Sequence, residues 1–385
     1  MRLVYGIVGE GMGHATRSLP LLRHLLGRGH EIRVVVSGRA FDYLVERLGS
    51  HPAIRFNRIP GLRLRYRNNR LDIPGSIGVN LLRAASGVRE NLEAFRRIRQ
   101  EGFRPQAVVS DFDSWAVAYA RRFSLPLISI DNQHVLARCD LREVFPSRSL
   151  RFRMTELVVR MKVPSAYHYL ITSFFFPPVR KPRTTLFPPI LREAILSAHR
   201  EPRDHVLVYL RSFPQSKLIP CLKRLPHRFR VYGMDSEGFD GNVHYRVFSE
   251  GGFLDDLRTA RALVDGGGFS LLSEALNLHV PVLSIPIEGQ LEQELNALYL
   301  ERLQYGASAR RLDPEAIEEF LSHPEEAGTR LADYPREDNS LILAALDEIL
   351  DRASRGEKAP NLLEAPAKGK WGAKPTEIGP NPRPR

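Results

Sequence analysis

The chain has 385 residues, of which 43% are hydrophobic and 26% are charged, and its formal net charge is +12. This length predicts two domains of about 150–200 residues each, and the composition excludes a disordered or fibrous chain. The longest apolar stretch, Tyr169 to Val179, is interrupted by prolines and falls well short of the roughly 20 residues of a membrane-spanning helix. Residues 1–8 run into a glycine loop without a signal-peptide cleavage site, and the only two cysteines, Cys139 and Cys221, are isolated. We therefore expect a cytoplasmic protein without disulfides.

Short apolar strands alternate with helices along the first half, a pattern typical of an α/β domain with a parallel sheet. The expected elements are strand 3–8, helix 15–26, strand 31–37, helix 41–48, helix 77–100, strand 107–110, helix 115–123 and strand 127–130. A proline-rich stretch, residues 175–189, should interrupt regular structure because proline fixes φ and lacks a backbone donor. We expect a first domain over 1–175 and a linker over 176–202.

The same alternation restarts after the linker and predicts a second α/β domain over 203–353. Its expected elements are strand 206–210, helix 217–224, strand 230–232, helix 254–260, strand 262–264, helix 270–278, strand 282–285 and helix 291–303. Residues 354–385 are rich in proline and glycine and contain few large apolar side chains. Such a segment buries too little surface to offset its ordering entropy, so we expect a disordered basic tail.

Charge divides unevenly along the chain. Residues 1–200 carry 33 Lys and Arg against 15 Asp and Glu, whereas residues 201–353 carry 16 against 26. A basic half suits nucleic acid, an anionic membrane or a phosphorylated acceptor, although it also fits an arginine-rich solvated surface. Arginines concentrate in 55–70 and in 148–162, where they alternate with apolar residues as in an amphipathic element on lipid or an ordinary surface helix. No nucleic-acid-binding module accompanies the charge, so nucleic acid is the least favoured partner.

The first chemical motif is the loop GEGMGH at residues 9–14, between a buried strand and a helix. Glycines such as Gly11 and Gly13 allow a close approach to a ligand, and the following helix N-terminus attracts an anion. A dinucleotide-binding loop would need a glycine where His14 stands and an acidic residue after the second strand, where residues 37–39 read SGR. His14 is better suited to proton transfer, unless it only caps the loop.

The second motif, DGGGFSLLSEA at residues 265–275, repeats this arrangement in the second half. Gly267, Gly268, Phe269 and Ser270 open a helix and offer backbone amides and a hydroxyl to an anion. Glu274 follows about one turn later, where a carboxylate can accept two hydrogen bonds from a vicinal diol such as a ribose. Further along, a helix begins with polar residues that suit the recognition of sugar hydroxyls, Glu292 and Gln293.

These residues resemble the nucleotide-sugar glycosyltransferases of GT-B fold, in the branch related to MurG and the UDP-glucuronosyltransferases. The resemblance covers both halves and rests on the following residues: His14 and Arg17, Gly267 and Gly268, Glu274, Pro281, Pro286, Glu292 and Gln293, Asn296 and Ala297. It implies two facing Rossmann-like domains with a cleft between them, an acceptor bound mainly by the first and a donor mainly by the second. It also implies transfer with inversion, without a metal or cofactor.

The resemblance further implies roles for single residues. Glu274 would hold the donor ribose, the amides from Gly267 onward the diphosphate, and Glu292 with Gln293 the sugar hydroxyls. His14 would be the general base, and Gly11, Gly13 and Arg17 around it would belong to the loop on the acceptor side. Gly266 stands where plant and animal members usually carry a histidine that touches the phosphate, which leaves that contact to amides and to Arg211 after the first strand of the second domain.

Three aspartates in the first half follow or end strands: Asp111, Asp113 and Asp131. Each is a candidate to orient His14 and stabilise its protonated form, and the sequence does not choose among them; Asp111 is the one that we name with His14 as catalytic. Residues 111–113 also read as the D-x-D pair that binds a divalent metal in the other large glycosyltransferase fold, but no further ligand clusters nearby.

We therefore expect an inverting glycosyltransferase that uses a nucleotide diphosphate sugar, most simply a UDP-sugar, with a lipid or cell-envelope precursor as acceptor. The protein would be cytoplasmic or peripheral on the inner face of a membrane. The alternatives are an epimerase or hydrolase of nucleotide sugars with the same fold, and a non-catalytic nucleotide-binding protein.

Overall fold

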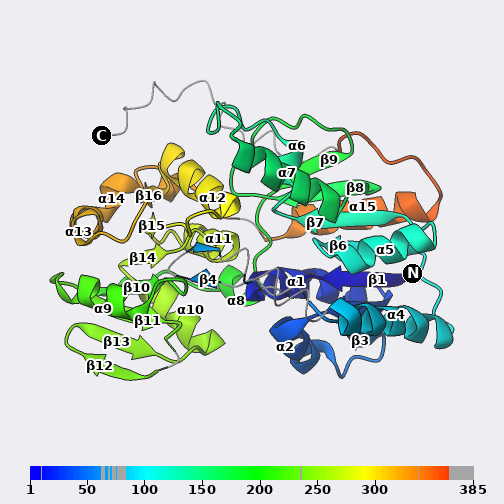
Figure 1. Cartoon of the computed structure of the whole chain (residues 1–385), viewed down its shortest axis with the longest axis horizontal. Helices are drawn as coiled ribbons and strands as arrows, with labels where there is room; N and C mark the ends of the chain where they lie inside the picture. Colours follow the sequence, from blue (N-terminus) through cyan, green and yellow to red (C-terminus); the bar gives the residue numbers. More distant parts are fainter. Residues whose placement is uncertain are drawn as a thin grey trace.

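The computed structural model describes residues 1–9, 11–61, 66–67, 70–71, 75, 84–234, 236–336 and 338–363. It contains two seven-stranded sheets, one from each half of the chain, which lie side by side along the longest axis of the molecule (Figure 1). Helices flank both sheets. The α/β class and the two Rossmann-like halves expected from the sequence are confirmed.

The first sheet is entirely parallel and has the order β3-β2-β1-β6-β7-β8-β9. Its strands are β1 (Arg2–Ile7), β2 (Glu31–Val36), β3 (Ile54–Arg58), β6 (Ala107–Asp111), β7 (Leu127–Asp131), β8 (His168–Thr172) and β9 (Thr184–Phe187). The helices of this half are α1 (Met12–Gly27), α2 (Gly38–Leu48), α4 (Ala84–Gln100), α5 (Ser114–Arg122), α6 (Val135–Arg138) and α7 (Leu150–Lys162). A small ladder joins β4 (Tyr66–Arg67) to β5 (Arg70–Leu71). The strand order reverses between β1 and β6, and ligands of such sheets bind at the carboxyl ends of the strands at this point.

The second sheet has the order β12-β13-β11-β10-β14-β15-β16, in which only β12 runs antiparallel. Its strands are β10 (His205–Tyr209), β11 (Arg228–Tyr232), β12 (Gly238–Asp240), β13 (Val243–Arg246), β14 (Ala262–Asp265), β15 (Val282–Ser284) and β16 (Gly306–Ser308). Its helices are α8 (Glu193–Leu196), α9 (Gln215–Lys223), α10 (Glu250–Thr259), α11 (Phe269–Asn277), α12 (Leu291–Arg302), α13 (Pro314–Ser322) and α14 (Pro324–Ala327). The order reverses between β10 and β14, so the second glycine loop, which follows β14, lies at the corresponding point of this sheet.

The last helix, α15 (Ser340–Ser354), returns to the first half of the molecule. Its apolar face, with Ile342, Leu346 and Ile349, is buried in the core that contains Leu3 and Leu170. The expected boundary of the second domain at residue 353 therefore differs from the structure, because this helix packs on the first sheet.

The chain beyond α15 also differs from the expected disordered tail as far as residue 363. Leu363 is buried in the same core, and its amide donates to Oγ1 of Thr185 at 3.1 Å. The amide of Thr184 donates to the carbonyl of Asn361 at 3.2 Å. Residues 364–385 of the expected tail lie outside the described residues.

Strand β9 lies within the proline-rich stretch that was expected to interrupt regular structure. Prolines 182 and 188 flank the strand instead of interrupting it, and β9 occupies the sheet edge, where a missing donor is tolerated. The first sheet therefore continues to Phe187, and the segment that links the two sheets is shorter than the expected 176–202. Of the expected helix 77–100, residues 84–100 are described and form α4.

Candidate active site

His14 and Asp111 come together at the carboxyl ends of two adjacent strands. Strand β1 leads into the glycine loop and α1, whose first turn carries His14, and Asp111 is the last residue of β6. Ile7 pairs with Asp111 in the β1–β6 ladder, so both segments leave the sheet at the same level. Nδ1 of His14 lies 2.8 Å from Oδ1 of Asp111. The carboxylate is buried, with 1% of its side chain exposed, whereas the imidazole is 13% exposed.

Arg17 lies one turn after His14 on α1 and binds the same carboxylate. Its Nε donates to Oδ2 of Asp111 at 2.9 Å, and the hydroxyl of Ser18 donates to Oδ2 at 3.1 Å. Burial by itself would raise the pKa of Asp111, but the charges of Arg17 and His14 and their hydrogen bonds lower this pKa to about 2. Asp111 is therefore an anion at neutral pH, and Arg17, expected on the acceptor side of the glycine loop, helps to keep it so.

The ring of His14 presents its second nitrogen away from the carboxylate. Nε2 lies 3.5 Å from the amide nitrogen of Gln133, which can only donate a hydrogen bond. Nδ1 also lies 2.6 Å from Nη2 of Arg17, a donor that would suit an unprotonated Nδ1, but Nη2 donates to Oδ1 of Asp111 at 2.5 Å and so already has an acceptor. A proton on Nδ1, donated to Asp111, leaves the lone pair on Nε2, and this is the tautomer that a base requires.

The other two candidate aspartates have different partners. Asp113 caps α5, where its Oδ1 accepts from the amide of Ala116 at 2.8 Å, and burial raises its pKa to about 6. Asp131 accepts from the amide of His134 at 2.8 Å and lies 2.7 Å from Nδ1 of the same residue. Of the three, Asp111 is the one whose carboxylate contacts His14.

Asp265, the buried last residue of β14, holds the second glycine loop in place. Its Oδ1 accepts from the amide of Gly267 at 3.0 Å, and Nδ2 of Asn296 donates to the carbonyl of Gly267 at 2.9 Å. Gly267 has a φ of +77°, which favours glycine. Burial raises the pKa of Asp265 to about 7. The amide of Gly267, expected to contact a diphosphate, is therefore directed to Asp265, and the amides at the start of α11 are left for that role.

The amino-terminal ends of α1 and α11 meet across the two domains. A Cβ added to Gly13, in the first turn of α1, would lie 2.5 Å from Oγ of Ser270 in the first turn of α11. Gly11 and Gly268 are the N-cap residues of these helices, and neither provides a side-chain cap. The first N–H groups of a helix have no partner within the helix. Two such ends, both with positive potential, therefore lie together beside His14.

A hydrogen-bonded chain connects the first domain to α12. Nη1 of Arg17 donates to Oδ1 of Asn132, and Nδ2 of Asn132 donates to Oε1 of Glu292 at 2.7 Å. Oε1 of Gln293 accepts from the amide of Ile287 at 2.9 Å, which positions the loop before α12. Glu292 thus belongs to the same site as His14. The role of Asn132 was not anticipated, although the polar run at the end of β7 was visible in the sequence.

Glu274 lies on α11 and is paired with an arginine from the linker. Nε and Nη2 of Arg192 lie 2.7 and 2.8 Å from Oε1 and Oε2 of Glu274, and both side chains are mostly buried. The sequence did not single out Arg192. Arg211, in contrast, is exposed, and its Cγ would lie 2.9 Å from a Cβ on Gly233, which follows β11. Because β11 and β14 lie on opposite sides of β10, Arg211 is turned away from the glycine loop that it was expected to assist.

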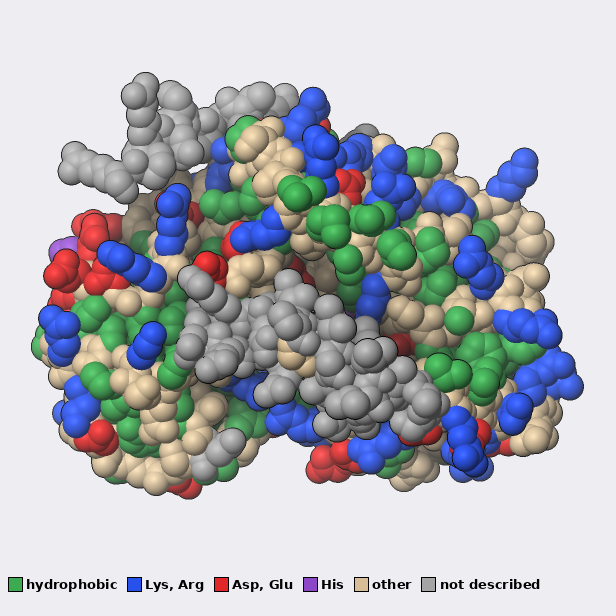
Figure 2. All heavy atoms as spheres, viewed as in Figure 1, with side chains coloured by type: hydrophobic (Ala, Val, Ile, Leu, Met, Phe, Trp, Pro, Cys, Tyr) green, Lys and Arg blue, Asp and Glu red, His purple; other side chains and the backbone are tan. Residues whose placement is uncertain are grey.

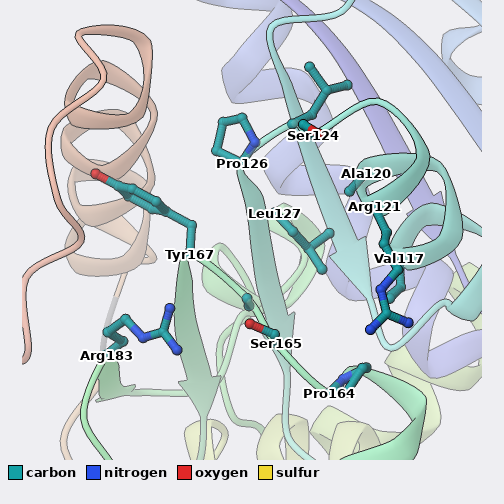
Figure 3. A pocket seen from close by; sticks show the side chains of 12 residues that line it. Val117, Ala120, Arg121, Ser124, Pro126, Leu127, Pro164, Ser165, Tyr167 and Arg183 are labelled. Carbon is teal, nitrogen blue, oxygen red and sulfur yellow. The ribbon is translucent and has the colours of Figure 1, made fainter.

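A pocket of about 510 Å³ lies away from this site (Figure 3). It is lined by Leu127, Tyr167 and Arg183, which stand at the amino ends of β7, β8 and β9. The carboxyl ends of parallel strands share one edge of the sheet, so this pocket opens on the edge opposite His14. Within the described part of the chain, no group of three or more His, Cys, Asp or Glu side chains is placed to hold a metal.

The two facing Rossmann-like domains are those of the GT-B fold. Two plant enzymes have similar structures. A UDP-glucosyltransferase from Polygonum tinctorium capable of glucosylating indoxyl has a TM-score of 0.61 at 16% identity, with 91% of this chain and 98% of that chain covered. Arabidopsis thaliana UGT89C1 complexed with UDP has a TM-score of 0.65 at 14% identity, with coverages of 92% and 99%.

Sequence comparison gives the family. Residues 1–324 match the family described as glycosyl transferase family 1, and the chain belongs to this family. A protein of Methanosarcina acetivorans described as an uncharacterized glycosyltransferase is 27% identical in an alignment that covers 83% of this chain and 89% of that protein. A Methanosarcina mazei protein with the same description is 25% identical over the same coverage.

Proposed function

We propose that this glycosyltransferase transfers a sugar from a nucleotide diphosphate donor, most simply a UDP-sugar, to an acceptor hydroxyl with inversion of configuration. The observation that carries the proposal is the meeting of two uncapped helix N-termini, those of α1 and α11, beside the His14–Asp111 pair. The helix ends offer N–H groups to the diphosphate, and its negative charge grows as the bond to the sugar breaks.

The donor lies along the start of α11 in this proposal. The amides of Phe269 and Ser270 bind the diphosphate, and Glu274, about one turn further on, accepts hydrogen bonds from the ribose hydroxyls. Glu292 and Gln293 at the start of α12 read the hydroxyls of the transferred sugar. The contact between Asn132 and Glu292 supports this arrangement, because it brings α12 to the residues around His14.

His14 acts as the general base. The acceptor oxygen attacks the anomeric carbon from the face opposite the diphosphate, the bond to the diphosphate breaks, and the hydroxyl proton passes to Nε2 of His14. Nδ1–H meanwhile donates to Asp111, whose negative charge stabilises the imidazolium that forms. The nucleoside diphosphate leaves with the bonding electrons, and the imidazolium returns its proton to solvent.

Replacement of His14 by Ala tests this assignment. Turnover with a UDP-sugar should fall roughly 100-fold or more while the affinity for UDP, measured by calorimetry, stays within a factor of about two, because the base acts only in the transition state. His51→Ala, an exposed histidine outside the site, is the matched control. Near-normal turnover of the His14 variant would remove this residue from catalysis. Release of free sugar without an acceptor would instead indicate a hydrolase.

We also propose that the acceptor is lipid-linked and that α7 rests on an anionic membrane. One face of this helix exposes large apolar side chains at helical spacing, Leu150, Met154, Leu157, Val158 and Met161. Figure 2 shows hydrophobic side chains over this part of the surface, with lysine and arginine side chains beside them. Arg153 and Arg160 are exposed on the same helix. The apolar side chains can insert at the boundary between headgroups and acyl chains, and the neighbouring cations are attracted to anionic headgroups.

Among the described residues, no helix is long and apolar enough to cross a bilayer. Co-sedimentation with anionic and neutral vesicles over a salt series tests the proposed contact of α7 with a membrane. The wild-type protein should bind anionic vesicles and leave them as salt rises, and Met154→Glu with Met161→Glu should abolish binding. Phe239→Glu, which changes an exposed apolar residue on the other domain, is the control. Failure of the wild-type protein to bind at low salt would overturn the proposal, as would a dimer that these two changes dissociate.

A further inference from the structure

Arg192 connects the proposed ribose site to both domains. It lies in the linker, at the N-cap of α8, and only 8% of the residue is exposed. Each oxygen of Glu274 receives one N–H group from this guanidinium, at 2.7 and 2.8 Å. Such a two-point contact fixes both the position and the rotation of the carboxylate.

A third nitrogen of Arg192 continues the chain of charges. Nη1 donates to Oε1 of Glu250 at 3.0 Å, and Glu250 also pairs with Nη2 of Arg47 on α2. The hydroxyl of Tyr43 on α2 donates to Oε1 of Glu250 at 3.4 Å. Two carboxylates and two guanidinium groups therefore alternate from α11, through the linker and α10, to the first domain.

We propose that Arg192 is a positioning residue that holds Glu274 ready for a ribose diol and makes this readiness depend on the contact between the domains. This inference rests on the proposed function. A carboxylate has about four lone-pair sites and Arg192 uses two of them, so two remain for the 2′- and 3′-hydroxyls of a nucleotide. Arg192 itself does not contact the nucleotide. Its anchorage to Glu250 and Arg47 transmits the position of α2 to the donor site.

The test compares UDP with 2′-deoxy-UDP, which lacks one of the hydroxyls that Glu274 would bind. Calorimetry on the wild-type protein should show tighter binding of UDP. Arg192→Gln should lower the affinity for UDP by about 10-fold or more, because the carboxylate of Glu274 is then no longer held in position. It should also reduce the preference for UDP over the deoxy nucleotide. Arg203→Gln, an exposed arginine of the same linker, should leave both affinities unchanged.

A purely structural role would weaken both nucleotides equally, and an unchanged preference in the Arg192 variant would overturn the inference. Tighter UDP binding by this variant would also overturn it, because Arg192 would then compete with the donor for Glu274. If Arg192→Gln does not fold, Glu250→Gln gives the same comparison. It keeps the Arg192–Glu274 pair but removes the carboxylate of Glu250 that anchors Arg192. An unchanged preference for UDP in this variant counts equally against the inference. Wild-type protein that binds no nucleoside diphosphate would reject the proposed function itself.

Discussion

Replacement of Asp111 by Asn should weaken the first domain as well as the reaction. The side chain is almost fully buried, and its two oxygens accept from His14, Arg17 and Ser18. Asn retains one oxygen but turns an NH₂ group toward Arg17, a buried guanidinium that then loses the carboxylate it is hydrogen-bonded to. Removal of one partner from a buried ion pair costs about 3–5 kcal/mol, more than the pair itself contributes.

The lowered pKa of Asp111 gives an independent magnitude for the stabilisation that this carboxylate provides. A fall from 3.8 to about 2 corresponds to about 2 kcal/mol of stabilisation at neutral pH. The folded pKa lies below the unfolded value, so this stabilisation is present above pH 4 and is lost as the pH falls toward 2. We therefore expect Asp111→Asn to lower the free energy of unfolding by about 2–4 kcal/mol at pH 7, and the difference from wild type to shrink at pH 3.

Urea unfolding at pH 7, 5 and 3 measures this difference. Trp115, buried on α5, reports the first domain by fluorescence. A second variant, Arg17→Met combined with Asp111→Asn, should be less destabilised than Asp111→Asn alone, because no buried charge then remains unpaired. Equal stability of Asp111→Asn and wild type at pH 7 would refute the reasoning, as would a difference that grows toward pH 3.

Three further changes have definite expected outcomes. Gly13→Ala should lower kcat/KM by about 10-fold in steady-state assays, because the added Cβ would clash with the side chain of Ser270. Ser270→Gly in the same protein should restore most of the activity, and a failure to restore it would contradict the interdomain contact. Asn339→Ala should lower the unfolding free energy by about 1–3 kcal/mol, measured by urea titration, since its side chain pairs with both the amide and the carbonyl of Leu191 at 2.9 and 2.7 Å. Asp265→Asn should flatten the pH dependence of stability, because a carboxyl with a folded pKa of about 7 stabilises the protein less as the pH rises from 4 to 7; thermal melts with unchanged slopes would contradict this.

The sequence predicted the strands nearest the middle of each sheet well because they are buried on both faces and read as continuous apolar runs. It missed two interior strands, β8 and β13, whose sequences HYLIT and VHYR mix apolar with polar residues. Strand β1 at Arg2–Ile7 and strand β14 at Ala262–Asp265 lie within a residue or so of their expected positions. Edge strands were missed: β3 carries arginines at positions 55 and 58, and β9 is flanked by prolines. Edge strands tolerate such residues because one side of their backbone is unpaired, so their sequences lack the signal of a buried strand.

The sequence alone could single out candidate site residues where they lie together in one short segment. His14 and the glycine loop sit in a single strand–loop–helix unit, and so does Glu274. Geometry was needed to choose Asp111 from three aspartates, since all three stand near strand ends and only pairing across the sheet brings one to the imidazole. Nothing in the sequence pointed to Arg192 as a site residue, because a lone arginine in a linker is common and its partner Glu274 lies 82 residues away.

The return of α15 to the first sheet has a consequence for the order in which the protein is made. The core beneath β1 contains Leu3 and Leu170 but is completed by Ile342, Leu346 and Leu363. A ribosome therefore finishes the whole second sheet before it releases the helix that covers the first. The first sheet has all its strands by Phe187, but part of its apolar surface stays uncovered until α15 has been made. The strands of the second sheet and the helices that flank them are complete by Ala327. On the ribosome we expect the later half to be the first to reach its final packing.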